Sequence, residues 1–457
     1  KSATDGQSPM MSRSPQTRGS KAESTLRSPP KMKIEPQTIA TLTRNRGADS
    51  TLRVRIDAAG SAGKFSPSDT GKVIYDNSCW RFIMPTLNKI FDKCGVALYQ
   101  NESLDLDHYY QEPYQDEGDE IKVIGEPFET DKSKKIRKYD LYVEDRTFSN
   151  FSFFMDGSRR TYKIGDIVID GKKIYPVVVA QIRAGCTERD GEKKLRSHQT
   201  IQRKNLLLLS DKVNTVDFKE IQQRITRTKV AQEMFLEVVD YRFEPEKHNI
   251  PVNAAIAKAN IMMHDMEIGI LSDMVKSGAL DTDRMLVVDG PLQFLRQDTG
   301  KTEFADLFYN VIGVSKSFNP MLPTSSKSKR GGTQIGAELL KLEYGERTPV
   351  FLKENDRGRR FGVWYLRIRP KNRVSNPLEG IIKIEKMALE DYYDSGIPTD
   401  VVDTISLSLL NECSPTCYGR DERWASHLYP VYLTETLIKS TFESDLVFIN
   451  NFKRDFR

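Results

Sequence analysis

The sequence is poor in cysteine and has no long hydrophobic run. Its five cysteines in 457 residues are few and odd in number, which argues against the disulfide framework of a secreted protein. No segment approaches the roughly 18 apolar residues of a membrane span, so we expect no membrane association and a cytoplasmic location. Cys413 and Cys417 have the spacing of half a zinc site, but no second Cys or His pair accompanies them.

A nucleotide-binding loop is also missing. Gly300-Lys301-Thr302 resembles the end of such a loop, but Leu295 stands where the motif requires its first glycine. We therefore expect any ATP hydrolysis to come from a partner.

Charge is distributed unevenly along the chain. The net charge is +5, yet residues 1–72 carry thirteen basic and six acidic side chains, a surplus of +7 that leaves −2 for the remainder. This segment begins at Lys1, has no apolar core of a signal or transit peptide, and is expected to be a flexible basic tail. Such a tail can hold nucleic acid electrostatically or can simply be solvated.

Hydrophobic periodicity predicts an α/β protein, a mixed sheet flanked by helices. An accessory segment is expected at 73–150 and the main domain at 151–457. Helices are predicted over Cys79–Tyr99, Ala254–Gly278, Val401–Leu410 and Val431–Phe442, and strands over Ser152–Met155, Lys163–Ile169, Ile174–Ile182, Met285–Val288, Val363–Ile368 and Ile381–Ile384, with a further apolar run at Leu307–Val314. Loops are expected at 109–120 and 324–332, and Asp170-Gly171 predicts a hairpin turn.

Two apolar runs end in Asp-Gly, at Asp156 and at Asp289. An aspartate at the end of a buried strand, followed by a glycine, can bind a ligand that approaches the backbone closely. Asp-Gly is also a common turn, and Asp170-Gly171 is an example of that alternative. Asp289 differs from Asp170 because no return strand follows it directly.

Glu267 interrupts the apolar face of the long predicted helix. Met263, Ile270 and Met274 share this face at intervals of three or four residues. A carboxylate there is costly unless it is paired or bound to a cation; the alternative is a position at the edge of the face. Together with Asp156 and Asp289, Glu267 completes a predicted three-carboxylate site, and Mg²⁺ or Mn²⁺ prefer such oxygen ligands.

The order of motifs resembles the NurA family of DNA-end-processing nucleases, which have a ribonuclease-H-like core. The similar segments cover about two thirds of the chain. They are FFMDGS (Phe153 to Ser158), the helix with Glu267, LVVDGPL (Leu286 to Leu292), VIGVSKSF (Val311 to Phe318), WYLRIRP (Trp364 to Pro370) and HLYPVYLTETLIKS (His427 to Ser440).

The resemblance implies a Mn²⁺- or Mg²⁺-dependent deoxyribonuclease that acts as a homodimer on DNA ends. It further implies a hexameric HerA-type ATPase as partner and a role in DNA repair or in anti-phage defence. Asp156, Glu267 and Asp289 would be the metal ligands, with Lys316 and His427 as further catalytic candidates.

Basic residues near these motifs are candidates for DNA contact. They are Arg159, Arg160, Lys316, Arg330, Arg359 and Arg367. Lys316 is either phosphate-facing or an ordinary exposed lysine, and Arg367 points either to DNA or to solvent. The family carries a histidine after its late Tyr-Pro element, where this chain has Thr434, Glu435 and Thr436. His427 is either its substitute or a surface histidine.

Two other functions remain open at the level of sequence. The first is a non-catalytic assembly subunit, which would dock on a motor ring and guide DNA without cutting it. The second is an RNA-directed enzyme of the same broad fold.

Overall fold

The structure is a computed structural model, and it describes residues 87–106, 127–133, 136–138, 149–169, 171–191, 194–213, 215–292, 307–321, 334–354, 360–417 and 424–453. The predicted basic tail, the loops at 109–120 and 324–332, and Gly300-Lys301-Thr302 lie outside these residues. No helix in the described part of the chain is long and apolar enough to cross a membrane.

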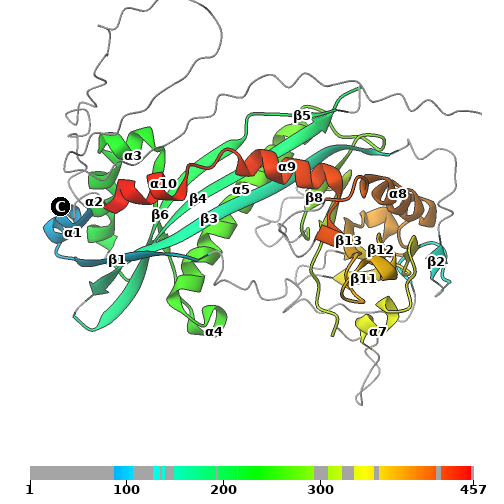
Figure 1. The fold of residues 1–457 in the computed structure, drawn as a ribbon, viewed down its shortest axis with the longest axis horizontal. Helices are drawn as coiled ribbons and strands as arrows, with labels where there is room; N and C mark the ends of the chain where they lie inside the picture. Colours follow the sequence, from blue (N-terminus) through cyan, green and yellow to red (C-terminus); the bar gives the residue numbers. More distant parts are fainter. Residues whose placement is uncertain are drawn as a thin grey trace, which may run out of the picture. The chain divides into compact units, whose positions relative to one another are not determined.

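The core is one mixed sheet with helices on both faces (Figure 1), as the sequence predicts. Its main path runs in the order β2-β10-β12-β13-β9-β8-β3-β4-β6-β7. The strands are β1 (Ala97–Asp105), β2 (Arg137–Lys138), β3 (Phe151–Ile169), β4 (Lys173–Arg189), β5 (Leu195–Ser197), β6 (Gln202–Ser210), β7 (Leu236–Tyr241), β8 (Met285–Asp289), β9 (Val311–Ser315), β10 (Glu346–Arg347), β11 (Phe351–Glu354), β12 (Arg360–Arg367) and β13 (Ile381–Met387).

The helices include the predicted ones and several that sequence patterns did not indicate. They are α1 (Leu87–Lys93), α2 (Thr215–Thr226), α3 (Lys229–Glu233), α4 (Pro245–His248), α5 (Pro251–Lys276), α7 (Ile335–Leu339), α8 (Thr399–Glu412), α9 (Tyr429–Lys439) and α10 (Asp445–Lys453), with short 3₁₀ turns η3 (Lys371–Arg373), η4 (Glu390–Tyr392) and η5 (Trp424–Ser426). Pro251 occupies the first turn of α5, where its missing N–H costs nothing. Gly278, with φ +66°, follows its end.

A long antiparallel hairpin of β3 and β4 forms the centre of the sheet. The two separate strands predicted at Ser152–Met155 and Lys163–Ile169 are one continuous strand, because β4 pairs with β3 along its whole length. The predicted hairpin turn from β3 into the return strand β4 is confirmed. Ile169 pairs with Lys173, and Gly171 has φ +64°. Asp170 itself lies outside the described residues.

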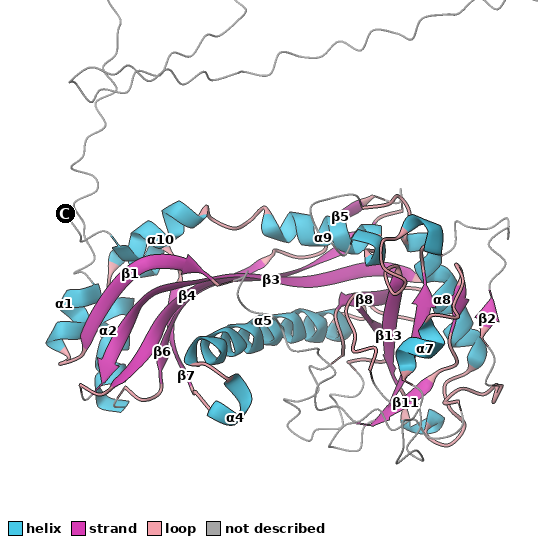
Figure 2. Cartoon of the chain, turned by 60° about the horizontal axis from the view of Figure 1, so that its bottom comes forward, coloured by secondary structure: helices cyan, strands magenta, loops and turns pink. Residues whose placement is uncertain are grey.

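Alternate residues of β3 face different helices, since side chains of a strand alternate between the two faces of its sheet. Phe153 and Met155 belong to the apolar cluster that includes α5, whereas Phe154 belongs to the cluster that includes α8 and Val431 of α9. Figure 2 shows α5 on one face of this hairpin and α9 and α10 on the other. This division decides which helix can supply side chains to a given strand residue.

The accessory segment is built into the same sheet. Helix α1 ends at Lys93, and residues from Ala97 onward form β1 on β3, so the helix predicted to continue to Tyr99 is too long. Its end is explained by Gly95, whose φ of +72° turns the chain.

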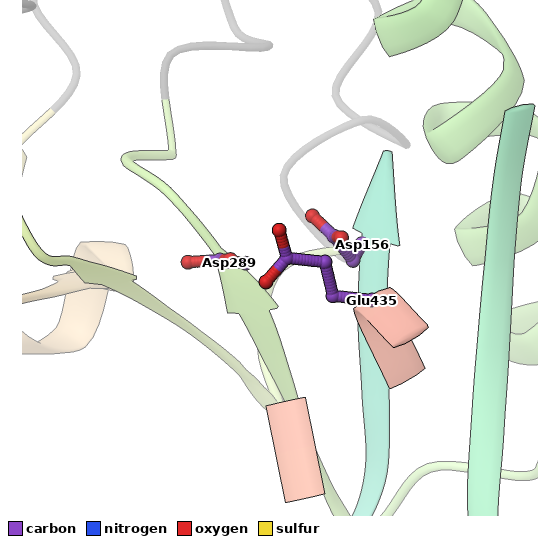
Figure 3. A group of neighbouring side chains, drawn as sticks. All are labelled: Asp156, Asp289 and Glu435. Carbon is purple, nitrogen blue, oxygen red and sulfur yellow. The ribbon is translucent and has the colours of Figure 1, made fainter. Parts of the chain in front are cut away.

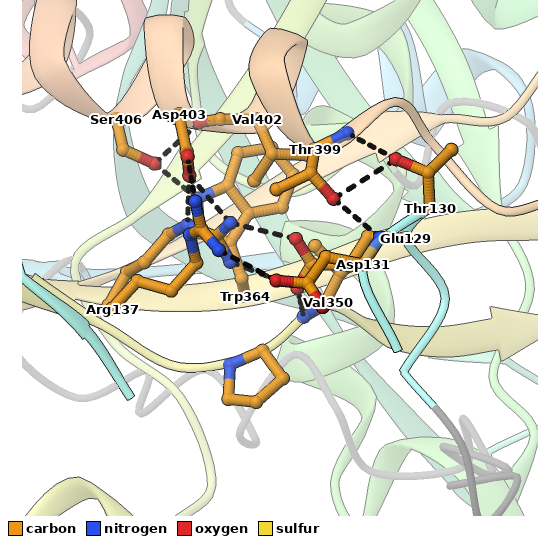
Figure 4. A network of polar contacts seen from close by, with 12 residues as sticks. Glu129, Thr130, Asp131, Arg137, Val350, Trp364, Thr399, Val402, Asp403 and Ser406 are labelled. Atoms are coloured by element: carbon orange, nitrogen blue, oxygen red, sulfur yellow. Dashed lines mark hydrogen bonds and ion pairs between the residues drawn. The ribbon is translucent and has the colours of Figure 1, made fainter. Parts of the chain in front are cut away.

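A largely buried network of charges fixes residues 127–133 and 136–138 against α8 (Figure 4). The guanidinium of Arg347 donates to both carboxylate oxygens of Glu129, at 2.8 and 3.1 Å, and to Asp403 of α8 at 3.0 Å. Arg137 of β2 donates to the same Asp403 at 2.6 Å. Because Arg347 and Glu129 are almost fully buried, removal of Arg347 would leave the charge of Glu129 uncompensated.

Candidate metal centre

Three carboxylates converge at the end of β8. Among the residues that the structure describes, Asp156, Asp289 and Glu435 each offer a ligand oxygen, and these oxygens all lie within 4.8 Å of one another. Figure 3 shows their side chains directed toward a common space, from β3, β8 and α9 respectively. The structure thus brings together the two aspartates predicted from the sequence and adds a glutamate that was not predicted.

The two aspartates meet because their strands are parallel neighbours. Met155 pairs with Val288, the residue before Asp289, and the β3–β8 pairing ends there. Asp289 is the last residue of β8, as predicted. Asp156 is not at a strand end, which corrects the prediction, because β3 continues on β4 with Asp156 opposite Gly185. It instead marks the point where β3 loses its neighbour β8.

Glu435 comes from helix α9, which covers the Asp156 face of the sheet. Thr434 of α9 lies 2.6 Å from Thr187 of β4, oxygen to oxygen. A Cβ added to Gly185 would be 3.2 Å from Ile438 of α9, so the helix packs closely where Gly185 pairs with Asp156. The buried positions Val431, Thr434 and Ile438 define the inward face of α9. Glu435 lies four residues after Val431 and three before Ile438, on the edge of that same face.

Lys316 lies among the three carboxylates. Its Nζ is 2.7 Å from Asp289 Oδ2 and 3.9 Å from Glu435 Oε2, and its side chain is 6% exposed. Burial would lower the pKa of Lys316, but the carboxylates, Asp289 foremost, raise it above its ordinary value. The alternative of an ordinary exposed lysine is therefore wrong.

The carboxyl groups respond differently to this environment. Burial is the largest cause that raises the pKa of Asp156 well above its ordinary range, and the negative charges of Asp289 and Glu435 act in the same direction. Burial would also raise the pKa of Glu435, but Lys316 and a hydrogen bond from Lys439 lower it. The environment of the cluster therefore shifts two of its pKa values in opposite directions, that of Asp156 upward and that of Glu435 downward.

Glu267 is buried, at 2% exposure, but it is not part of the cluster. The predicted apolar face of α5 is confirmed, and Glu267 is buried within it together with Met263 and Ile270. The alternative that Glu267 lies at the edge of this face is therefore wrong. A Cβ on Gly157 would collide with Glu267 Oε1, which places Glu267 on the Gly157 face of β3 rather than the Asp156 face. Its negative charge still contributes to the raised pKa of Asp156. Its near partner is His264, whose Nδ1 lies 2.8 Å from Oε2.

His427 is buried just before α9, at 1% exposure, so it is not a surface histidine. Its ring meets that of Tyr432 edge to face, with centroids 5.9 Å apart. It is one of the groups that lower the pKa of Glu435. His427 therefore lies beside the cluster.

The predicted DNA-contacting arginines are placed differently. Arg367 is fully buried, and its guanidinium donates to the carbonyl oxygens of Leu342, Glu379 and Pro377. Arg367 therefore faces neither DNA nor solvent.

Two further arginines lie along β3. Arg160 pairs with Asp445 at 2.8 Å, and Arg159 donates to Thr161. Arg330 and Arg359 lie outside the described residues.

The chemistry of the donor set suits a hard divalent cation. Two oxygens on one octahedral Mg²⁺, at about 2.1 Å each, are about 3.0 Å apart when adjacent and about 4.2 Å apart when opposite. The three oxygens, which lie within 4.8 Å of one another, would therefore move closer together to share one ion. Cys413 and Cys417 are free and buried, and in the described part of the chain they belong to no group of potential metal ligands.

No protein-family model matches the sequence, and no curated protein matches it. Among solved structures, the crystal structure of the NurA nuclease from Sulfolobus solfataricus is similar with a TM-score of 0.35 and 9% identity, over 66% of this chain and 81% of that chain. A TM-score this low does not establish a shared fold, and this identity does not establish a shared family.

Proposed function

We propose that this protein is a metal-dependent nuclease that cleaves phosphodiester bonds in DNA. The observation that supports it is the convergence of Asp156, Asp289 and Glu435 at the end of β8. Three carboxylates in one partly buried place repel one another and lose hydration, which is costly without compensating positive charge. A divalent cation is the partner that such an oxygen-rich site accepts best.

Asp156, Asp289 and Glu435 would hold the cation. When bound, Mn²⁺ or Mg²⁺ supplies a more acidic water and stabilises negative charge on phosphate oxygens. The pKa of Asp156 is raised in the protein alone, and a bound cation would favour the ionised form that a ligand needs.

The neighbouring residues would position these groups. Lys316 holds Asp289 in place at 2.7 Å and offers an ammonium group for a substrate phosphate. His427, which is buried just before α9, lowers the pKa of Glu435 and so favours its ionised form. Glu267, on the other face of β3, adds negative charge near Asp156.

The ribonuclease-H-like interpretation is supported by the strand order. In the path β6-β4-β3-β8-β9, the first three strands are antiparallel and the last three are parallel neighbours. Helix α5 is the last element of the connection from β6 to β8, which also contains α2, α3, β7 and α4. The HerA-type ATPase, the homodimer, the action on DNA ends and the role in repair or defence remain proposals that rest on the resemblance of the sequence motifs.

One observation favours a second function, that of a non-catalytic assembly subunit. Lys316 already places a buried positive charge 2.7 Å from Asp289 and 3.9 Å from Glu435. The cluster could therefore be a buried ion-pair network that needs no metal.

A nuclease assay on linear DNA with Mn²⁺ distinguishes the two functions. It compares the native chain with Asp156→Asn, Asp289→Asn and Glu435→Gln, each with and without a HerA-type ATPase. The nuclease proposal predicts that each substitution lowers the cleavage rate by about 100-fold or more, since a metal supplies several kcal/mol of transition-state stabilisation.

A matched control is Glu338→Gln, which changes an exposed glutamate of α7 paired with Lys341. It should cut as the native chain does. Equal cutting by all variants would refute the site, and no cutting by the native chain under any of these conditions would favour the assembly subunit. Replacement of the DNA by single-stranded RNA tests the RNA-directed alternative.

A further inference from the structure

A cavity lies at the ends of β8 and β9 that are opposite to the acidic cluster. It has a volume of about 180 Å³, and its wall includes Met285, the first residue of β8, and Asn310, which precedes β9. Asp289 is four residues further along β8, about 13 Å away at 3.3 Å per residue. The cavity is therefore separate from the candidate metal centre.

Lys386 of β13 is a buried ammonium group in the wall of this cavity. The residue is 7% exposed. Its Nζ donates to the carbonyl oxygen of Tyr309 at 2.7 Å and lies 5.8 Å from the centroid of the Tyr309 ring. In the described part of the chain, no ion pair joins Lys386 to a carboxylate. Burial lowers its pKa to about 8, which shows the cost of a positive charge here.

The rest of the wall is suited to an apolar body with one charged end. Met285 and Ile405 contribute apolar surface, and the side chains of Tyr309 and Tyr392 are hydrogen-bonded to each other. Asn150 adds a polar group: its Nδ2 donates to Thr282, whereas its buried Oδ1 accepts no hydrogen bond from the described residues. Asp400 also lines the cavity, but burial alone shifts the pKa of Lys386, so the Asp400 carboxylate does not compensate its charge. The uncompensated ammonium group and the mainly apolar wall suit a small amphiphilic anion, whereas the open acceptor of Asn150 suits a donor elsewhere on the ligand.

We propose that this cavity binds a small organic carboxylate, with Lys386 as its counter-charge and the apolar wall around its body. The cavity volume of about 180 Å³ is below the roughly 300–1,000 Å³ of pockets that hold drug-sized ligands, which favours a single ring with a carboxylate. The site is independent of the proposed nuclease activity.

Benzoate and benzamide test the proposal on the full chain, because the two probes have almost the same shape and differ in charge. Ligand-observed NMR titration should show benzoate bound about tenfold or more tighter than benzamide, since a charge-assisted hydrogen bond is formed by benzoate alone. Lys386→Met should remove this preference, so that the two affinities agree within about twofold. Lys341→Met, a change of an exposed lysine on the protein surface, should leave it intact.

A second measurement needs no variant. Benzoate should slow acetylation of Lys386 by acetic anhydride, read by mass spectrometry, and leave acetylation of Lys341 unchanged. The proposal is overturned if benzoate shows no saturable binding, if benzamide binds equally well, or if benzoate fails to protect Lys386.

Discussion

Glu385 of β13 provides a stability prediction that bears on the candidate metal centre. Its carboxylate is 2% exposed, lies 2.8 Å from Lys383 and 3.5 Å from Lys353, and accepts the backbone N–H of Leu292 at 3.0 Å. Leu292 is three residues after Asp289, so Glu385 fixes the chain as it leaves the centre. We predict that Glu385→Gln destabilises the protein and loosens this segment.

The magnitude follows from the pKa. Burial would raise the pKa of Glu385, but the two lysines outweigh burial and lower it from 4.5 to about 2. At about 1.36 kcal/mol per unit, this shift contributes about 3 kcal/mol of stability. Because the folded-state pKa is the lower one, the contribution is complete above pH 4.5 and is lost as the pH falls toward 2.

Urea unfolding at two pH values tests this prediction. Glu385→Gln should lower the free energy of unfolding by about 3 kcal/mol at pH 7 and by about half as much at pH 3. The control Glu338→Gln should change it by less than about 0.5 kcal/mol at both values. A loss of the same size at pH 7 and pH 3 would refute the reasoning, since it would show that the charge of Glu385 is not the source.

Three further substitutions have defined outcomes. Lys386→Met should raise the free energy of unfolding by about 3 kcal/mol below pH 8, since the buried ammonium group with its pKa lowered to about 8 costs most there. The gain should fade as the pH rises toward 10.5, and a gain independent of pH would contradict this. Arg347→Met should lower the free energy of unfolding, measured by heat or urea, by about 3 kcal/mol or more, because Glu129 stays buried without its partner. A loss below about 1 kcal/mol would show that other groups compensate the charge of Glu129. Gly157→Ala should displace Glu267 and cost about 1–3 kcal/mol, while the adjacent Ser158→Ala should not move that side chain; an unchanged position of Glu267 in a crystal structure of the Gly157 variant would contradict this.

The main elements of the fold follow from local patterns. The Asp170-Gly171 pair predicts the central hairpin, and the apolar face of α5 predicts a buried helix, because turn geometry and helical periodicity are local properties. The polar sequence from Asp156 to Arg160 hides the continuity of β3, which depends on pairing with β4. The run Leu206–Leu209, which belongs to β6, does not by itself predict a strand, since a short apolar run does not distinguish a buried strand from a helix.

The site could be predicted only in part, for a geometric reason. Asp156 and Asp289 stand out because each follows an apolar strand sequence. The third member depends on which helix covers which face of the sheet, and the sequence contains no local signal of that choice. Glu435 could nevertheless have been considered, because it interrupts the inward face of α9 as Glu267 interrupts that of α5.

The central claim is that Asp156, Asp289 and Glu435 form a site for a divalent cation. Electron paramagnetic resonance titration of free Mn²⁺ measures this directly and requires no substrate. We predict saturable binding to the native chain, with affinity at least about tenfold weaker in Glu435→Gln and in Asp289→Asn and unchanged in the control Glu338→Gln. Equal Mn²⁺ affinity in all four proteins, or no binding to the native chain, would contradict the account.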